Sequence, residues 1–380
     1  MKIVIAPDSF KESLTAKEVA ELIEEGIKRV FPRAEVVKVP LSDGGEGTVE
    51  ALIEARGGEF IHKKVTSPLG EKIEAYFGIL ADGVTAVIEM AQASGLSLVT
   101  GEKRNPLITT TYGTGELIKE ALRRGCKKII IGVGGSATVD GGAGMAQALG
   151  AKLLNEVGEE IPFGGGSLGE IVRIEMNEFH PIVKDVEVIV ASDVNNPLCG
   201  EKGAAKVYGS QKGATSEMVE ILDKNLLHFA YMIEKFLNKR VKDIAGSGAA
   251  GGLGAGLIAF LGAKPKSGVE LIIELSHLKE KIKGADLIIS GEGRIDEQTM
   301  YGKTPIGVAR LARKENIPVI LIGGEIRGDV GGLYEEGVSA LMSSIEQVSS
   351  LSQVLKNSKS SLIKASERAM RLVKIGCFLR

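Results

Sequence analysis

Acidic side chains stand at or just beyond the ends of four predicted β-strands. They are Asp8, Asp43, Asp193, and the pair Glu292 and Asp296. In a parallel sheet the carboxyl ends of the strands meet at one edge, so side chains from distant segments can share a single site there. One acid after a strand more often caps a helix or forms a turn. Four such ends favour a site for a hard cation such as Mg²⁺, which prefers carboxylate oxygens.

A second segment that could bind a ligand runs from Lys127 to Gly150. A β-branched apolar run is followed there by a glycine-rich loop, by Ser136, and by an Ala- and Gly-rich stretch predicted to be helical. This order can form an anion site from bare amides and the positive end of a helix dipole, and phosphate is the natural ligand. The loose dinucleotide fingerprint Gly132-x-Gly134-x-x-Ala137 also fits, and glycines at such turns often serve only close packing. The loop alone leaves these alternatives open.

Three cations are candidates for contacting a transferring phosphate or an acidic substrate. They are Lys11, Arg294 and Lys303, and each can equally be a solvated charge at a helix end. Lys303 belongs to a Gly-Lys-Thr sequence that is similar to the end of a P-loop. Glu297 stands where the opening glycine is required, so the Walker pattern fails.

Other catalytic chemistries find less support. No Gly-x-Ser-x-Gly motif surrounds a candidate nucleophile. The histidines and cysteines have neither metal-ligand spacing nor a local signature of covalent catalysis. They are His62, His180, His228, His277, Cys126, Cys199 and Cys377.

The composition predicts a soluble cytoplasmic protein of two domains. The 380 residues exceed one ordinary core, and 44% hydrophobic content is enough for two. A net charge of −2 and the lack of Trp provide no basic, aromatic surface for nucleic acid. An odd number of separated cysteines suits a reducing compartment. The N-terminal apolar run is too short for a signal peptide, and the uncharged stretch 246–263 is too short to span a bilayer, so no membrane partner is expected.

The first part of the chain predicts a parallel sheet. Residues 2–6 are a β-branched run, and Thr15 and Glu18 form a capping box for a helix reaching about Val30. A strand over 35–39 and a helix over about 48–55 follow. Successive βα units imply parallel strands. The same pattern returns from residue 285, with a strand over 286–290, a loop from Gly291 and a helix to about Glu315, and completes this domain.

The middle of the chain has a different sequence pattern. Residues 72–80 and 85–91 alternate in polarity around a short turn, which predicts a β-hairpin. We therefore predict an α/β protein with a discontinuous Rossmann-like parallel-sheet domain and an inserted second α/β domain that contains a mixed sheet. The predicted bounds are residues 1–65 plus 283–380 for the first domain and 66–282 for the second.

The inserted segment contains a literal dinucleotide fingerprint, Gly246-x-Gly248-x-x-Gly251. No convincing strand precedes it, because the preceding VKDIA is short and polar. We interpret these glycines as positions where a helix packs closely.

Eight motifs resemble those of the type-1 glycerate kinase family, in the same order and over almost the whole chain. They are Ala6-Pro-Asp-Ser-Phe-Lys-Glu-Ser-Leu14, Ser42-Asp-Gly-Gly-Glu-Gly-Thr48, Tyr112-Gly-Thr-Gly-Glu-Leu117, Gly134-Gly-Ser-Ala-Thr-Val-Asp-Gly-Gly-Ala-Gly144, Asp193 with Asn196-Pro-Leu198, Gln211-Lys-Gly-Ala214, Gly248-Ala-Ala-Gly-Gly252 and Gly291-Glu-Gly-Arg-Ile-Asp296.

This resemblance implies phosphorylation of D-glycerate with ATP and Mg²⁺, in bacterial members usually at the 2-hydroxyl, giving 2-phospho-D-glycerate. It also implies two α/β domains with the active site in the cleft between them. Three positions depart from the family pattern: Ser42 where Ala is common, Val139 where Asn is frequent, and Ser210 where Pro is common. Val139 lies in the glycine loop and offers no polar contact to a substrate or nucleotide.

The roles of individual residues are hypotheses within this resemblance. Asp193 is expected to accept the proton of the substrate hydroxyl, and Lys11 and Arg294 to neutralise the transferring group or hold the carboxylate. Asp43 and Asp296 are expected to attract Mg²⁺. The residues expected to contact substrate or phosphate are Asp8, Ser9, Gly134, Gly135, Ser136, Gly141, Gly142, Gly291 and Lys303.

Two alternative functions remain open from the sequence. A dehydrogenase would use the loose glycine fingerprint and needs an acid for the ribose, for which Glu156 lies at a tolerable distance but in a polar turn. A sensor of small acids would gain little from four acids near its anion site unless a metal were present. The expected partners are ATP and D-glycerate, and the expected assembly is a monomer or a homodimer.

Overall fold

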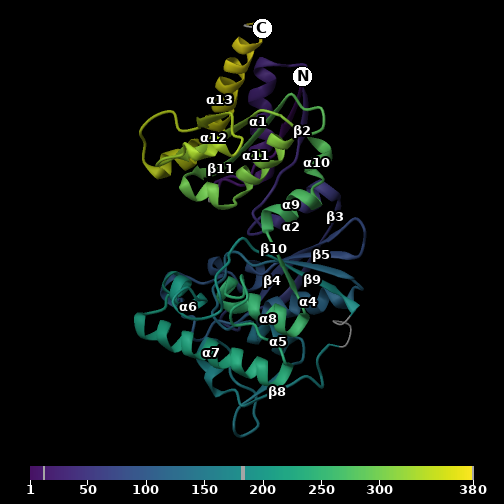
Figure 1. Ribbon diagram of the computed structural model, residues 1–380, viewed down its shortest axis with the longest axis vertical. Helices are drawn as coiled ribbons and strands as arrows, with labels where there is room; N and C mark the ends of the chain where they lie inside the picture. The colour runs from purple at the N-terminus through teal and green to yellow at the C-terminus, as the bar shows by residue number, and fades with distance from the viewer. Residues whose placement is uncertain (12, 181–184, 379–380) are drawn as a thin grey trace. The chain divides into compact units, whose positions relative to one another are not determined.

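A computed structural model describes residues 1–11, 13–180 and 185–378 (Figure 1). Glu12 of the first motif and the last two residues of the predicted discontinuous domain lie outside the described residues. Within those ranges, no helix is long and apolar enough to cross a membrane. The chain divides into two compact units. Unit 1 comprises Met1–Asp43, Glu50–Arg56 and Val269–Arg380, and unit 2 comprises Gly44–Val49 and Gly57–Gly268.

These divisions fall at residues other than the predicted 65/66 and 282/283. Strand β3 (Gly58–Thr66) pairs along its whole length with β4 (Lys72–Leu80), so it belongs to unit 2. Most of its sequence, GEFIHKKVT, is exposed and three of its nine residues are charged, so it lacks the clear apolar alternation expected of a strand. Helix α10 (Leu278–Lys281) and all but the first residue of α9 (Gly268–Leu275) belong to unit 1.

Unit 1 is built on a parallel sheet, which confirms the Rossmann-like fold class. All four neighbouring pairs of strands are parallel. The order across the sheet is β13 (Ala340–Ser343), β12 (Val319–Ile326), β11 (Leu287–Ile295), β1 (Lys2–Ile5) and β2 (Glu35–Lys38). Ile3, Ile5, Ile289 and Ile322 belong to one buried cluster, so the β-branched runs read from the sequence form the core.

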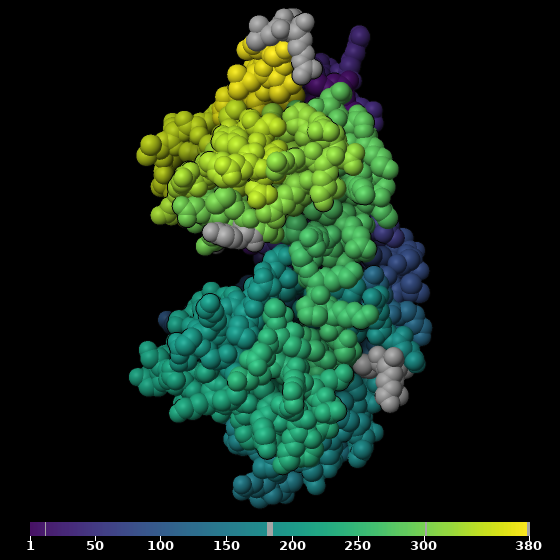
Figure 2. Space-filling model, viewed as in Figure 1, coloured from purple at the N-terminus to yellow at the C-terminus, as the bar shows by residue number. Residues whose placement is uncertain are grey.

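Two long helices pack together against this core. Helix α1 (Ala16–Val30) begins at Thr15, whose hydroxyl accepts from the amide of Glu18 while the Glu18 carboxylate accepts from the Thr15 amide, as the predicted capping box requires. Helix α13 (Leu351–Phe378) lies beside α1 (Figure 1). The close approach needs Gly26, where a Cβ would lie 2.5 Å from the Ser366 Cβ. The yellow carboxyl end of α13 projects from the rest of unit 1 (Figure 2). The other helices are α2 (Thr48–Arg56), of which residues 50–56 lie in unit 1, α11 (Thr304–Lys314) and α12 (Gly332–Glu335).

Strand β11 is longer than predicted. Its second half, Gly291–Ile295, was expected to be a loop, but it continues the pairing with β12 as far as Ile326. Gly291 makes this possible, because a Cβ there would lie 2.0 Å from the carbonyl oxygen of Ile322. Glycines therefore mark a close approach of two strands here, and the side chains of Glu292 and Arg294 project from a regular strand.

Unit 2 is built on a mixed sheet, as predicted. The order is β10 (Lys264–Lys266), β9 (Glu187–Ala191), β6 (Lys128–Gly132), β5 (Thr85–Glu89), β4 and β3. Strands β10, β9, β6 and β5 pair in parallel, and β4 pairs antiparallel with β5, which confirms the predicted hairpin. Strand β3, which the sequence did not predict, adds a second antiparallel pair with β4. A separate antiparallel pair consists of β7 (Lys152–Leu154) and β8 (Arg173–Glu175).

The helices of unit 2 pack closely through glycine. Gly251 and Gly252 have left-handed backbone angles, and a Cβ on Gly251 would lie 1.9 Å from the Thr138 carbonyl oxygen. The second fingerprint is therefore a packing feature, as interpreted from the sequence. The helices are α3 (Ala91–Ser94), α4 (Tyr112–Arg123), α5 (Ala143–Ala148), α6 (Ala204–Tyr208), α7 (Ser216–Leu237) and α8 (Leu253–Leu261).

Candidate functional site

A pocket of about 930 Å³ lies at the carboxyl edge of the unit 1 sheet. Each of the five strands leads into its wall, through Asp8 after β1, Asp43 after β2, Glu292 in β11, Glu325 in β12 and Ser344 after β13. This edge is where open α/β sheets bind ligands, because loops and helix starts converge there. The predicted site residues in its lining are Asp8, Ser9, Lys11, Asp43, Arg294, Asp296 and Lys303.

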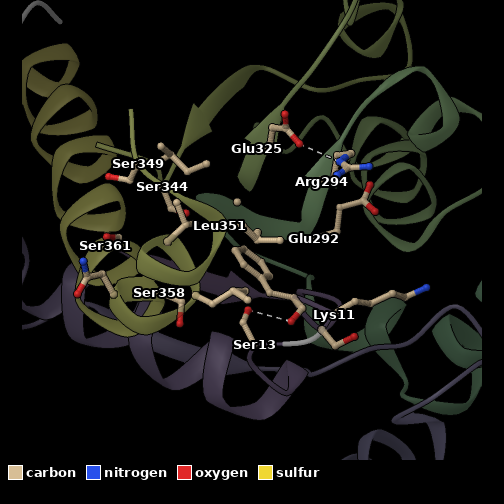
Figure 3. A pocket seen from close by; sticks show the side chains of 18 of the residues that line it. Lys11, Ser13, Glu292, Arg294, Glu325, Ser344, Ser349, Leu351, Ser358 and Ser361 are labelled. Carbon is tan, nitrogen blue, oxygen red and sulfur yellow. Dashed lines mark hydrogen bonds and ion pairs between the residues drawn. The ribbon is translucent and has the colours of Figure 1, made fainter. Parts of the chain in front are cut away.

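The pocket has two chemically different walls. Lys11, Arg294 and Glu292 lie on one side (Figure 3). The opposite wall comes from the segment after β13 and the first turns of α13, and carries hydroxyl groups. Its serines are Ser344, Ser349, Ser358, Ser360 and Ser361. The sequence did not point to this wall, because scattered serines resemble an ordinary polar helix surface.

Asp8 is the most deeply placed carboxyl group of the charged wall. Its side chain accepts from the Ser9 amide at 2.6 Å and from the Thr304 hydroxyl at 2.6 Å. Burial, and next the charge of Asp43, raise the pKa of Asp8 to about 7, against the lowering effect of these hydrogen bonds. Asp8 can therefore gain or lose a proton near neutral pH.

Lys11 and Asp43 form an ion pair in the same charged wall of the pocket. The Lys11 ammonium lies 3.4 Å from an Asp43 carboxylate oxygen. The charge of Asp43 raises the pKa of Lys11, so the amine stays protonated. Lys11 remains largely exposed and can still meet a ligand in the pocket.

The carboxylates of the charged wall suit Mg²⁺ without forming a ready-made cage. Among the described residues, no three His, Cys, Asp or Glu side chains gather as a metal cluster. Mg²⁺ in phosphoryl-transfer enzymes is usually held by one or two carboxylates together with phosphate oxygens and water. Asp43 raises the pKa of Asp8 by its charge, and a cation beside the two would relieve that repulsion. The donor chemistry of Asp8 and Asp43 therefore fits such an ion.

Lys303 joins two acids of the same wall. Its ammonium lies 2.9 Å from Glu292 and 3.7 Å from Asp296. Glu292 also accepts from the Thr299 hydroxyl at 2.6 Å, and burial raises the pKa of its carboxyl group. Asp296 caps the short helix that follows it, accepting from the amide of Gln298. Lys303 is thus held close to the pocket by carboxylates.

Arg294 is held in a similar way. Its Nε lies 2.9 Å from a Glu325 carboxylate oxygen, across the paired strands β11 and β12 (Figure 3). Both side chains are exposed, so the pair is weak and can exchange for an anionic ligand.

Asp193 belongs to unit 2. One of its carboxylate oxygens accepts from the Ser267 hydroxyl at 2.7 Å and from the Gly268 amide at 3.0 Å. These contacts lie at the start of α9, so Asp193 helps to cap that helix, as is common for an acid that follows a strand.

The glycine loop of unit 2 lies between a strand, β6, and a helix, α5, as predicted, but the helix is short and starts well after Gly134 and Gly135. Helix α5 begins only at Ala143 and has six residues. The amides of Gly142 and Gly144 donate to the buried carboxylate of Asp140, and the Gly141 amide donates to the Gly251 carbonyl. The protein thus supplies its own anion at this helix start. Exposed backbone remains at Gly134 and Gly135.

Two buried charges that the sequence reasoning missed hold this loop. Asp140 also accepts from the amide and hydroxyl of Thr111, and burial raises the pKa of its carboxyl group. The Lys212 ammonium donates to the Ser136 hydroxyl at 2.7 Å and to the Thr138 carbonyl at 2.8 Å. Both residues lie inside quoted motifs, but Asp before Gly and Lys before Gly are also typical of exposed turns.

Comparison with known proteins supplies the family. Residues 3–374 match the model of the glycerate kinase family. The chain is 52% identical to a glycerate kinase of Haemophilus influenzae, covering 98% of this chain and 99% of that protein. It is also 52% identical to the glycerate 2-kinase of Escherichia coli, covering 99% of each. A crystal structure described as glycerate kinase 2 from Salmonella typhimurium LT2 superposes with a TM-score of 0.89, at 48% identity and 99% coverage of each chain. The chain therefore belongs to the glycerate kinase family, a family of ATP-dependent kinases.

Proposed function

We propose that this protein transfers the γ-phosphate of ATP to the 2-hydroxyl of D-glycerate, giving 2-phospho-D-glycerate. The observation that carries the proposal is the unit 1 pocket, in which Lys11, Arg294 and Lys303 face carboxylates at the ends of parallel strands. Phosphoryl transfer requires cations for the transferring group and carboxylates for Mg²⁺ and the acceptor hydroxyl. The name of the Escherichia coli relative supports the position of phosphorylation.

The size of the pocket agrees with this proposal. Pockets of about 300–1,000 Å³ take drug-sized ligands such as a nucleotide, and this one has about 930 Å³. A three-carbon acid alone would leave most of that volume to water. The wall of serine hydroxyls offers donors and acceptors to a large polar ligand.

The metal is proposed to be Mg²⁺, with Asp43 and Asp296 as its protein ligands and Asp8 beside Asp43. When bound, the ion would neutralise charge on the phosphate oxygens. The fit rests on the carboxylate donors of the charged wall, because hard cations prefer oxygen ligands and tolerate a site completed by phosphate and water.

The cations of the same wall are proposed to contact the anionic groups of the substrates. Lys11 and Arg294 are exposed, and their ion pairs with Asp43 and Glu325 are weak, so a phosphate or carboxylate can replace those partners. Lys303, between Glu292 and Asp296, is proposed to contribute charge from a fixed position. Ser9 and Gly291 act indirectly, since Ser9 binds Asp8 and Gly291 allows the strands to pair.

Asp193 stays the predicted acceptor of the hydroxyl proton. Asp8 is a second candidate, because its carboxylate lines the pocket at the end of β1 and can face an acceptor hydroxyl there. Asp193→Asn tests the first candidate, because loss of the base should lower kcat while KM for glycerate stays near the wild-type value, and a near-normal kcat would favour Asp8 instead.

The proposed reaction is tested by ADP release in the presence of D-glycerate and Mg²⁺, followed by NMR of the product. A phosphate on C2 couples to one carbon-bound proton and gives a ³¹P doublet, whereas a phosphate on C3 couples to two and gives a triplet. We expect a doublet. A triplet would contradict 2-phosphorylation, and the absence of ADP release would contradict the function itself. The absorbance of NADH with the same acid should stay constant, which a dehydrogenase would not allow.

We further propose a cytoplasmic location and a monomeric or homodimeric state. Cys126 and Cys199 are buried free thiols and Cys377 is an exposed one, which suits a reducing compartment. Sedimentation velocity measures the assembly directly.

A further inference from the structure

Lys212 is an unusual residue in unit 2. It ends the short helix η5 (Ser210–Lys212), and only 2% of its surface is exposed. Its ammonium donates to the Ser136 hydroxyl and to the Thr138 carbonyl, and within the described residues it forms no salt bridge. Burying a cation costs free energy of folding unless partners compensate its charge, so a buried lysine is kept more readily where its charge has a function.

The bond from Lys212 fixes the direction of the Ser136 hydroxyl. An ammonium group only donates, so the Ser136 oxygen must accept, and its own hydrogen has to point elsewhere. No acceptor in the described part of the chain takes that hydrogen. The hydroxyl is therefore polarised by a cation on one side and has a hydrogen to donate on the other.

The backbone beside Ser136 also offers hydrogen-bond donors that no acceptor in the described structure takes. The amides of Gly134, Gly135 and Ser136 meet no acceptor among the residues the structure covers. Gly134 and Gly135 are exposed, and Gly135 has a φ of +72° that bends the chain so that successive amides can converge. The buried Thr138 hydroxyl next in line also lacks a partner in the described structure.

We propose that Lys212 is a positioning residue that orients and polarises the Ser136 hydroxyl, so that it donates, with the amides of Gly134 and Gly135, to an anionic oxygen of a substrate. The proposal rests on the proposed function, in which both substrates are anions. The oxygen belongs either to the glycerate carboxylate or to an ATP phosphate. Lys212 itself does not touch the ligand.

The electrostatics of the site agree with this role. Burial lowers the pKa of Lys212 to about 7, and the charge of Asp140 partly opposes the shift. Arg104 also lies close to η5, since it reaches the Gln211 carbonyl at 3.5 Å. The protonated form of Lys212 orients the hydroxyl as described, so the function of the site should decline as pH rises above about 7.

Ser136→Ala tests the proposal most directly, because it removes the donating hydroxyl while Lys212 keeps its bond to Thr138. We expect KM for one substrate to rise about 10- to 100-fold, as for the loss of a hydrogen bond to a charged group. A rise in KM for glycerate assigns the oxygen to the carboxylate, and a rise in KM for ATP assigns it to a phosphate. Exposed Ser216 at the start of α7 supplies the control, since Ser216→Ala should change neither KM.

Lys212→Met tests the positioning role itself. It should raise the same KM as Ser136→Ala, the double variant should be no worse than the more impaired single variant, and the basic limb of the kcat/KM profile near pH 7 should disappear. If Ser136→Ala changes neither KM, or if Lys212→Met only lowers the melting temperature, the proposal is wrong. If wild-type protein releases no ADP with D-glycerate, the proposed function fails instead, so the two failures are distinguishable.

Discussion

The pocket of unit 1 and the glycine loop of unit 2 hold charge in opposite ways. In unit 1 the side chains of Lys11 and Arg294 are 73% and 57% exposed, and they form ion pairs with Asp43 and Glu325 at the edge of the sheet. In unit 2 the charges of Asp140 and Lys212 are buried, at 0% and 2% exposure, and bind backbone and hydroxyl groups. The first arrangement leaves charge free to meet a ligand, and the second uses charge to fix the shape of a loop.

This difference separates two kinds of contribution to a phosphoryl-transfer site. Exposed ion pairs are worth little to stability, so they can exchange a partner for a substrate at small cost. Buried charges cannot exchange partners without losing their compensation, so they act by orienting what they hold. We expect substitutions in the pocket to change catalysis and substitutions under the loop to change stability as well.

The largest effect is expected for Asp8→Asn in the pocket of unit 1. Asn keeps the size of the side chain but stays neutral, so kcat should fall by about 1,000-fold, as for the loss of a charged catalytic group. The melting temperature should change little. Asp286→Asn is a matched control in the same unit, because Asp286 is exposed and does not line the pocket. A normal kcat in Asp8→Asn would contradict the claim that the charges of the unit 1 pocket serve catalysis.

The next effect is expected for Gly251→Ala, which probes the packing beneath the loop of unit 2. The added Cβ would lie 1.9 Å from the Thr138 carbonyl oxygen at a residue with φ of +67°. We expect a loss of about 3 kcal/mol or more in the free energy of unfolding. Gly262→Ala is the matched control, since Gly262 has φ of +64° and open space around it, and should lose about 1 kcal/mol. Equal losses in urea denaturation would show that close packing plays no part.

A third prediction concerns Glu120, a buried carboxylate of unit 2 that is bound by exposed cations. Hydrogen bonds from Arg123, with further ones from Lys63 and Arg124, lower the pKa of Glu120 to about 2. Because the pKa is lower in the folded state, the stabilisation is present above the unfolded pKa near 4.5 and is lost as pH falls from there towards 2. Glu120→Gln should cost about 2 kcal/mol at pH 7 and much less at pH 3.

Urea denaturation at the two pH values checks this prediction. Glu59→Gln, at an exposed position of β3, should have little effect at either pH. A loss that is the same at pH 7 and pH 3 for Glu120→Gln would mean that packing, and not charge, is responsible. Such a result would show that the charge of Glu120 does not contribute to the stability of unit 2.

The smallest effect is expected for Thr15→Ala in unit 1. The substitution removes the capping box of α1 and should cost about 1 kcal/mol without changing kcat. Thr215→Ala, at the cap of α7 in unit 2, is a companion variant with a similar expected loss. Chemical denaturation measures both. A fall in kcat for Thr15→Ala would show that the pocket of unit 1 depends on the rest of its scaffold more than the exposed charges suggest.

The regular elements of both units were largely predictable from local patterns. The capping box at Thr15 and the hairpin of β4 and β5 are local signals, and both are confirmed. The polar strand β3 was missed because its neighbour in the sheet, and not its sequence, makes it a strand. The extension of β11 through Gly291 was missed for the same reason, since glycine alone does not reveal that another strand approaches.

The site was predictable to the extent that it follows sheet topology. The rule that strand ends meet at one edge correctly placed Asp8, Asp43 and Asp296 on one pocket. Lys212 was not predicted, because nothing local distinguishes a lysine buried beneath a loop 76 residues away from an exposed one in a turn. Burial is set by the tertiary fold, so such residues become visible only in the structure.

The place of β1 in its sheet has a consequence for biosynthesis. β1 pairs with β2 on one side and with β11 on the other, and β11 begins only at Leu287, after the whole of unit 2. While the ribosome translates the intervening segment, one edge of β1 has no native neighbour. Open strand edges in a nascent chain invite wrong pairing with other chains. Unit 1 can therefore complete its sheet only late in translation, after every residue of unit 2 has been made.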